Sequence, residues 1–252
     1  MSGHSKWNSI KHKKAAIDAK RGRLFSRISK ELTVAAKVGG GDPVMNPRLR
    51  TVLLAAKEAN MPQDNIEKAI KKGTGELPGV SYEETVYECY GPGGVAIMVD
   101  ALTDNKNRTT SEIRSILSKK NGSMAGAGAV AWMFNKKAYF GVKAGKKEEE
   151  NIMERVIDAG VDDIDFDEEN NIFEITAPPE NFEKLRKLLE TCKYNVETSS
   201  LTFLPSSYIK VQGSEAQSVL SLVDALEDHD DVQNVYSNFD ISSEEIEKFE
   251  NG

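Results

Sequence analysis

The sequence has few of the residues that most often carry catalysis or bind metals. Its 252 residues include three histidines and two cysteines. Cys89 and Cys192 lie far apart without the spacing of a metal or redox motif, which fits a reducing compartment, so we expect a cytoplasmic protein. A catalytic histidine needs a rigid position beside a partner group, and His4, His12 and His229 show no such setting. We therefore expect neither an enzyme nor a bound metal or cofactor.

Long apolar runs are also lacking. Residues 95–99, Val-Ala-Ile-Met-Val, are typical of the longest. A helix that spans a bilayer needs about 18 or more apolar residues, so no such span is predicted. The sequence has no heptad pattern and no long apolar stripe of the kind that drives self-association. We expect a monomer that does not contact membranes.

Basic residues are concentrated at one end of the chain. Residues 1–72 contain sixteen Lys and Arg against six Asp and Glu, whereas residues 73–252 contain seventeen against thirty-four. Residues 1–30 alone hold nine cations and one acid, Asp18. This asymmetry, within a net charge of −7, indicates a polyanionic partner for the basic end of the protein.

The basic segment has the composition of a nucleic-acid contact. Lys and Arg neutralise phosphates and release counterions, and an exposed Trp can stack on an unpaired base. A solubilising basic tail is the alternative interpretation. We predict that the contact residues are Lys6, Trp7, Lys11, His12, Lys13, Lys14, Lys20, Arg21, Arg23, Arg27 and Lys30.

A glycine-rich stretch over residues 121–128 is a second candidate. A loop of small residues can approach a nucleic-acid backbone closely, although it can equally be a simple connection between a helix and a strand. The adjacent lysines favour contact. We predict a secondary contact loop made of Lys119, Lys120, Asn121, Gly122 and Ser123.

Three helices are predicted in the first part of the chain, beginning near residues 15, 46 and 62. Apolar residues spaced four apart indicate the first helix, and a run of glycines ends it. Asn46 and Pro47 suit the N-cap and the first position of the second helix. Gly73 suits the C-terminal cap of the third.

Strands and helices alternate in the remainder. Their order gives two β-α-β-β-α-β sets, each expected to form a ferredoxin-like sheet with helices on one face. One set runs continuously, and the other is split around it, with residues 82–90 as an extra strand. The strands are predicted at 82–90, 94–101, 129–135, 137–143, 163–167, 171–176, 194–203, 207–212 and 232–237, and the helices at 107–120, 147–159, 181–191 and 214–227.

The predicted fold class is therefore α+β multidomain, with an N-terminal three-helix domain and two ferredoxin-like α/β domains, one inserted into the other. The predicted units are a flexible basic arm (1–21), a helical domain (22–78), a split domain (79–135 with 206–240), an inserted domain (136–205) and a C-terminal tail (241–252).

Four acidic residues resemble the oxygen ligands of a calcium loop. Asp163, Asp165 and Asp167 alternate, and Glu174 follows eleven residues after the first. Glu168, however, occupies the position where such a loop needs glycine for its sharp turn. The apolar residues between and after these acids alternate as in a strand, so we predict a β-hairpin here.

Several motifs resemble the YebC/PmpR family, with the same order and spacing over essentially the whole chain. These motifs are GHSKW at 3–7, IKHK at 10–13, KRGRLF at 20–25, NMP at 60–62, DNIEKAIKKG at 64–73, YGPGGVA at 90–96 and TDNKNRT at 103–109. The resemblance implies a helical first domain and two α/β domains, the third inserted into the second. It also implies a role in gene expression, because bacterial members are described as DNA-binding transcriptional regulators. A mitochondrial relative activates translation of a cytochrome oxidase subunit, and bacterial members have been linked to the ribosome and to relief of stalling at proline runs.

We therefore expect a non-enzymatic regulator that binds either promoter DNA or RNA, the latter as rRNA or tRNA on the ribosome. The helical domain shows no clear recognition helix with side chains suited to base edges. A basic arm with Trp and His suits irregular RNA, which favours the RNA interpretation. The alternative is a protein-interaction scaffold that uses its acidic α/β domains.

Overall fold

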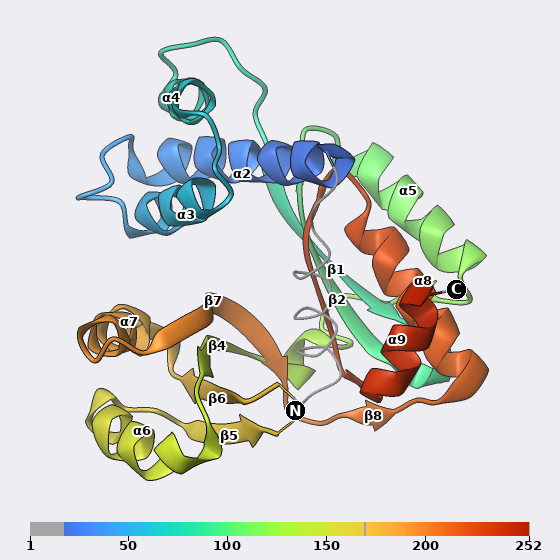
Figure 1. The fold of residues 1–252 in the computed structure, drawn as a ribbon. Coiled ribbons are helices and arrows are strands. Elements are labelled where there is room, and N and C mark those ends of the chain that lie inside the picture. Colours follow the sequence, from blue (N-terminus) through green and yellow to red (C-terminus); the bar gives the residue numbers. More distant parts are fainter. Residues whose placement is uncertain (1–17, 169, 252) are drawn as a thin grey trace.

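The computed structural model describes residues 18–168 and 170–251 (Figure 1). It contains helices and antiparallel sheets, which confirms the α+β class. Within the described residues, no helix has the length and apolar character needed to cross a membrane. The boundaries assigned to the arm and the domains stay predictions, and the names helical, split and inserted domain are used below for the groups of elements given in each case.

The helical domain consists of α2 (Asp18–Gly39), α3 (Pro47–Glu58) and α4 (Gln63–Thr74). Its apolar residues meet in one cluster that includes Leu32, Leu49 and Ile66. As predicted, Asn46 is the N-cap of α3, where its side chain accepts a hydrogen bond from the Leu49 N–H.

Gly73 is not the cap of α4, contrary to the prediction. The left-handed position that ends the helix is occupied by Gly75, with φ of 85°. Gly73 lies inside α4, where the helix crosses α2. A Cβ atom there would lie 2.3 Å from the carbonyl oxygen of Thr33, so this glycine allows the close packing of two helices.

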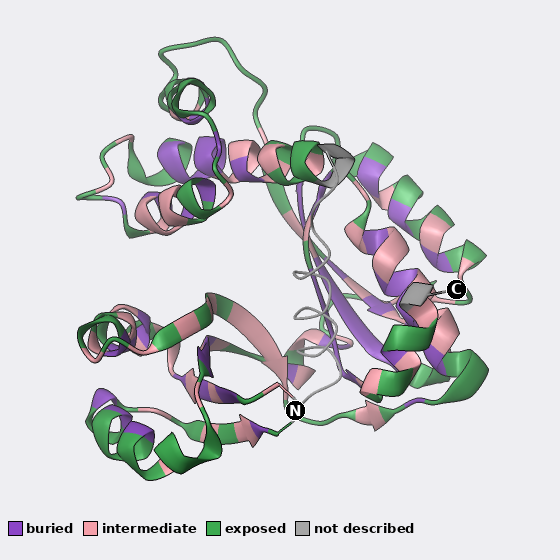
Figure 2. Ribbon diagram, in the orientation of Figure 1, coloured by how far each residue is buried: buried purple, intermediate pink, exposed green. Residues whose placement is uncertain are grey.

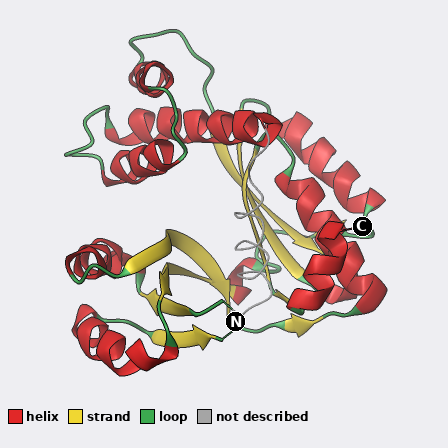
Figure 3. Cartoon of the chain, viewed as in Figure 1, coloured by secondary structure: helices red, strands yellow, loops and turns green. Residues whose placement is uncertain are grey.

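The split domain is a sheet with the strand order β3-β1-β2-β9, and each neighbouring pair is antiparallel. The helices α5 and α8 cover one face, as Figure 3 shows, and α9 packs beside α8. Apolar side chains from the strands and from these helices form its core. The elements are β1 (Glu83–Tyr90), η1 (Pro92–Gly94), β2 (Ala96–Thr103), α5 (Lys106–Lys119), β3 (Ser123–Met124), α8 (Gly213–Glu227), β9 (Val232–Ser237) and α9 (Ser243–Asn251).

The inserted domain is a second antiparallel sheet with the order β5-β6-β4-β7 and its own core. Its helices α6 and α7 pack on one face, so its elements follow the predicted order. The pairing of β5 with β6 is the predicted hairpin in place of a calcium loop. The elements are β4 (Phe134–Lys143), η3 (Lys146–Glu148), α6 (Glu149–Val156), η4 (Ile157–Ala159), β5 (Asp163–Asp167), β6 (Ile172–Ala177), η5 (Pro179–Asn181), α7 (Phe182–Thr191) and β7 (Asn195–Pro205).

Three expectations for the split domain are wrong. Residues 82–90 form β1, an internal strand and not an extra one, because the short turn η1 joins it directly to β2 as a hairpin. Of residues 207–212, only Ile209–Lys210 form a strand, β8, which pairs in parallel with β10 (Phe239–Asp240) in a separate small sheet. Residues 131–133 form the 3-10 helix η2 (Ala131–Met133), so the strand expected at 129–135 starts only at Phe134.

The segment expected to be a C-terminal tail instead forms α9, with Ile246 buried in the core of the split domain. The other face of the same sheet packs on the inserted domain through a smaller apolar cluster. There the ring of Phe203 in β7 meets Tyr236 in β9 edge-on, with 5.2 Å between the centroids. Figure 2 shows that buried residues lie along the strands of this sheet.

Candidate nucleic-acid interface

The predicted arm lies largely outside the described residues. This holds for Lys6, Trp7, Lys11, His12, Lys13 and Lys14, whose predicted role stays a prediction. Lys20 belongs to α2, and its side chain is not described. Arg21 is exposed, and its guanidinium lies 5.5 Å from the centre of the Phe25 ring. The remaining three predicted cations lie farther along α2.

Arg23, Arg27 and Lys30 face acidic groups of their own chain. These groups belong to the turn between α8 and β9, residues 227–231, which we call the acidic turn. Arg23 pairs with Asp228 at 3.3 Å, and Arg27 donates a hydrogen bond to the carbonyl oxygen of Glu227. The sequence places these partners about 200 residues apart, so this contact between the helical and split domains could not be predicted from it.

Lys30 makes the best-buried of these contacts. Its Nζ atom lies 2.6 Å from Oδ1 of Asp231 and donates to the carbonyl oxygen of Asp230 at 3.0 Å. The Lys30 side chain is 15% exposed and that of Asp231 is 6% exposed, so the ion pair is largely shielded from water. Loss of either partner would therefore leave a shielded charge without its counter-ion, which costs more than the loss of one partner of a surface pair.

Asp231 is also bound from α5. Its Oδ2 accepts hydrogen bonds from Nη2 of Arg108 at 2.7 Å and from Oγ1 of Thr109 at 2.8 Å. Burial acts to raise the pKa of Asp231, but the hydrogen bonds from Lys30, Arg108 and Thr109 outweigh it and hold this pKa well below its usual range. Asp231 is therefore the negative centre at which α2, α5 and the acidic turn meet.

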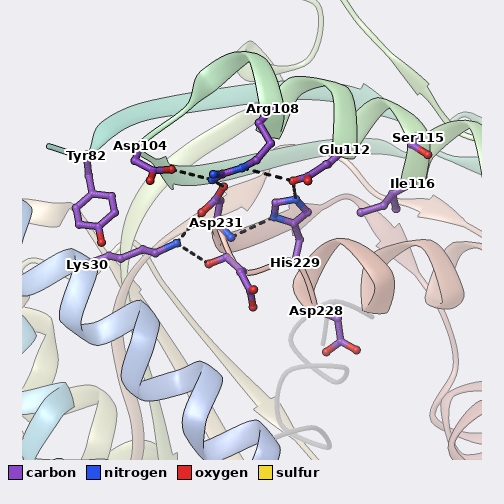
Figure 4. A pocket seen from close by; sticks show the side chains of 11 residues that line it. Lys30, Tyr82, Asp104, Arg108, Glu112, Ser115, Ile116, Asp228, His229 and Asp231 are labelled. Carbon is purple, nitrogen blue, oxygen red and sulfur yellow. Dashed lines mark hydrogen bonds and ion pairs between the residues drawn. The ribbon is translucent and has the colours of Figure 1, made fainter. Parts of the chain in front are cut away.

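The network continues to His229. Its Nδ1 accepts the N–H of Asp231 at 3.1 Å, so the neutral ring carries its proton on Nε2 and donates to Glu112 at 2.9 Å (Figure 4). These groups line a cavity of about 710 Å³ between the two domains. The lining residues are Lys30, Tyr82, Asp104, Arg108, Glu112, Ser115, Ile116, Asp228, His229, Asp230 and Asp231.

Three of these groups have the composition of a metal site. The ligand atoms of Glu112, His229 and Asp231 lie within 4.8 Å of one another. Both oxygens of Asp231, however, already accept hydrogen bonds from cations or a hydroxyl, and Nδ1 of the histidine accepts a backbone N–H. The arrangement is therefore a hydrogen-bonded ion-pair network that joins two domains.

The chain can be compared with known proteins. A family model described as the TACO1/YebC protein N-terminal domain matches residues 5–76, and one described as the TACO1/YebC second and third domain matches residues 82–239. The chain belongs to the TACO1/YebC family. It is 53% identical over 248 residues to the probable transcriptional regulatory protein GSU1074 of Geobacter sulfurreducens, covering 98% of this chain and 99% of that one.

Two further proteins are similar to this chain over most of its length. A probable transcriptional regulatory protein of Natranaerobius thermophilus is 54% identical over 250 residues, with 98% of this chain and 99% of that one covered. A crystal structure of the conserved hypothetical protein Aq1575 from Aquifex aeolicus superposes with a TM-score of 0.80 at 44% identity. That match covers 91% of this chain and 94% of the Aquifex chain, so the whole arrangement of helical and α/β elements is shared.

In this member of the TACO1/YebC family, the predicted secondary contact loop lies at the opposite end of α5 from Arg108. Lys119 and Asn121 are exposed, whereas Nζ of Lys120 donates to Oγ of Ser221 on α8 at 2.7 Å. Gly122 is half-buried, and a Cβ there would lie 3.0 Å from Leu117 and from Leu222, so it serves packing. Ser123 is exposed at the start of β3.

The glycine-rich residues after this loop are held in place by one carboxylate. Glu88 accepts backbone N–H groups from Gly128 and Val130 at 2.6 Å and from Ala131 at 2.8 Å. Burial acts to raise the pKa of Glu88, but these backbone hydrogen bonds outweigh it and lower the pKa. The stretch is thus an ordered connection, and its contact with nucleic acid stays a prediction.

The helical domain also carries lysines that the sequence analysis did not select. They are exposed and form no ion pair with a described residue. These residues are Lys57, Lys68, Lys71 and Lys72.

Proposed function

We propose that this chain is a non-enzymatic regulator of gene expression that binds nucleic acid through its basic arm and helical domain. The observation that carries the proposal is the separation of charge, because residues 1–72 hold sixteen cations and six acids while the rest of the chain is acidic. The exposed lysines of α3 and α4 extend this basic surface beyond the arm. The relatives named as probable transcriptional regulatory proteins support a regulatory role.

Phosphate contacts would supply most of the affinity. Arg48 is paired with Glu31 and Glu84, and Arg50 donates to the carbonyl oxygens of residues 43 and 44. The Arg48 guanidinium is therefore not available for bidentate contacts to base edges in a major groove, whereas Arg50 has only its Nη1 bound to the backbone. Lysines contact phosphates without reading sequence, which favours a target recognised by shape. We propose structured RNA as this target, with ribosomal RNA or tRNA as the physiological source.

Arg23, Arg27 and Lys30 can join such a contact only in competition with the acidic turn. Asp228 and Asp231 already supply the negative charges that phosphates would bring. The arm and the exposed lysines therefore carry the proposed contact, and these three cations primarily hold α2 on the split domain.

The experiment measures binding to an RNA hairpin and to a DNA duplex of equal length by fluorescence anisotropy between 50 and 200 mM salt. The test variant is Lys13→Gln/Lys14→Gln in the arm. Its matched control is Lys147→Gln/Lys187→Gln, which removes two exposed lysines of the inserted domain. With the value for single strands, each lost phosphate contact lowers the slope of log affinity against log salt by about 0.7.

We expect the arm variant to lose about 1.4 units of slope and the control variant none. RNA should bind more tightly than the duplex at 150 mM salt. Equal slopes for the two variants would refute phosphate binding by the arm. Tighter binding to promoter DNA than to RNA, without ribosome association in a sucrose gradient, would replace the RNA target with DNA. If the protein binds neither the RNA hairpin nor the DNA duplex, the alternative function as a protein-interaction scaffold remains.

A further inference from the structure

The helical domain presents three apolar side chains to water at one end. Val38, Val44 and Met45 are 75%, 78% and 77% exposed, the highest values among large apolar side chains in the described part of the chain. They flank the connection between α2 and α3, at the end of the helical domain farthest from α5 (Figure 1). We call these three residues the apolar tip.

The backbone of the apolar tip is fixed by a buried side chain. Asn46 is 4% exposed, and its Nδ2 donates to the carbonyl oxygens of Ala35 and Gly40, each at 2.8 Å. Its Oδ1 caps α3 at the N–H of Leu49. Gly39 leaves room for this amide, because a Cβ there would lie 2.6 Å from Nδ2. One asparagine thus joins the end of α2 to the start of α3.

Two further side chains, those of Asp42 and Arg50, bind the backbone of residues 43 and 44. Oδ1 of Asp42 accepts the N–H of Val44 at 2.9 Å. Arg50 donates from Nη1 to the carbonyl oxygens of Pro43 at 2.8 Å and Val44 at 3.3 Å. Several side-chain hydrogen bonds therefore fix the backbone that carries Val44 and Met45. These two side chains remain exposed to water and contribute no buried apolar area to this protein. Such preorganisation favours a ligand that covers them.

The size of the apolar tip and the charge beside it indicate which kind of ligand covers it. A stable protein interface buries about 800 Å² on each partner with about 20–30 residues, far more than three side chains provide. Insertion of an apolar side chain such as Met between bases needs only one or two residues. Arg50 places a cation beside Val44 and forms no ion pair with a described carboxylate, whereas the neighbouring Asp42 accepts the N–H of Val44.

We propose that Val44 and Met45 form a wedge that packs against unstacked bases of the bound nucleic acid, with Arg50 beside the adjoining phosphate. The proposal rests on the proposed function and adds to it a contact with bases. In a continuous duplex the wedge must first unstack a base step, at about a few kcal/mol, whereas a hairpin loop already offers unstacked bases. The wedge therefore gives the protein a preference for nucleic acid with unpaired bases.

The test uses the full chain and two probes. One is an RNA hairpin with 2-aminopurine in its loop, and the other is a fully paired RNA duplex of the same length. The variant is Val44→Ser/Met45→Ser, and the control is Ile157→Ser, an apolar side chain of the inserted domain that is 62% exposed. Thermal unfolding checks that both variants fold, as expected for exposed positions.

We expect the tip variant to bind the hairpin roughly tenfold more weakly, since the apolar contact of two side chains with the bases is lost. Its 2-aminopurine signal should no longer change on binding, while duplex affinity and the salt slope stay as in the wild type. An unchanged hairpin affinity and fluorescence signal in the variant would overturn the wedge and leave the proposed function intact. If the wild type binds neither probe at 50 mM salt, both the wedge and the proposed function are overturned.

Discussion

Replacing Asp231 with Asn tests how the helical domain is held on the split domain. The substitution keeps the size of the side chain and removes its charge. Lys30, only 15% exposed, then lacks its counter-ion. Removing one partner of a buried ion pair costs about 3–5 kcal/mol, whereas water can solvate the more exposed Arg108 once its own pair is lost. We expect the free energy of unfolding at pH 7 to fall by about 3–4 kcal/mol.

The pH dependence gives a second, independent measure. The folded-state pKa of Asp231 lies below that of an unfolded Asp, which is about 3.9. The unfolded state therefore binds the proton more readily. The stabilisation is fully present above the unfolded pKa and is lost as the pH falls through the folded one. The stability difference between wild type and Asp231→Asn should be constant from pH 5 to 8 and should shrink below about pH 4.

Urea unfolding followed by circular dichroism measures both quantities. The control is Lys30→Met, alone and together with Asp231→Asn. Because the double variant leaves no buried charge unpaired at this contact, it should be more stable than Asp231→Asn alone. A cost below about 1 kcal/mol for Asp231→Asn, or a difference that does not change down to pH 3, would refute the buried-pair argument.

Three further predictions concern packing, loop order and reactivity. Gly73→Ala should lower stability by about 1–3 kcal/mol because the new Cβ would press on Thr33, whereas Gly22→Ala, with nothing within 4 Å, should raise it by about 0.5–1 kcal/mol; thermal unfolding compares the two. Glu88→Gln should speed hydrogen exchange of the backbone amides in residues 128–131, and in the wild type the same amides should lose protection as the pH falls below about 4.3, since the pKa of Glu88 is lowered. Burial raises the pKa of Cys89 to about 12, so iodoacetamide at pH 8 should modify the half-buried Cys192 first, and equal rates would contradict this burial.

The sequence predicted local structure well where a short-range pattern determines it. Helices α3, α5, α7 and α8 begin and end within a few residues of their predicted bounds, because apolar periodicity and capping residues lie inside each element. The β5–β6 hairpin followed from alternation in the same way. The cap of α4 was placed at Gly73 and not Gly75, because sequence does not show that Gly73 is needed for contact with α2.

Long-range pairing could not be predicted in the same way. Residues 82–90 and 207–212 both have strand-like composition, so composition does not show which segment lies beside β2 in the split sheet. The contact of Lys30 with Asp231 joins positions 201 residues apart, and neither residue has a local signal for it. In the candidate site, composition indicated the cations of α2. It did not indicate the acidic turn, whose groups bind these cations.

The way the chain enters and leaves the inserted domain has a consequence for the order of folding. Phe134 at the start of β4 pairs with Pro205 at the end of β7, so entry and exit lie side by side. The inserted domain can therefore close on itself while the split domain is still incomplete. The latter needs β9 for its sheet and Ile246 of α9 for its core, and both come at the end of the chain. During synthesis, the split domain is thus completed after the inserted domain, and the acidic turn becomes available to hold α2 only then.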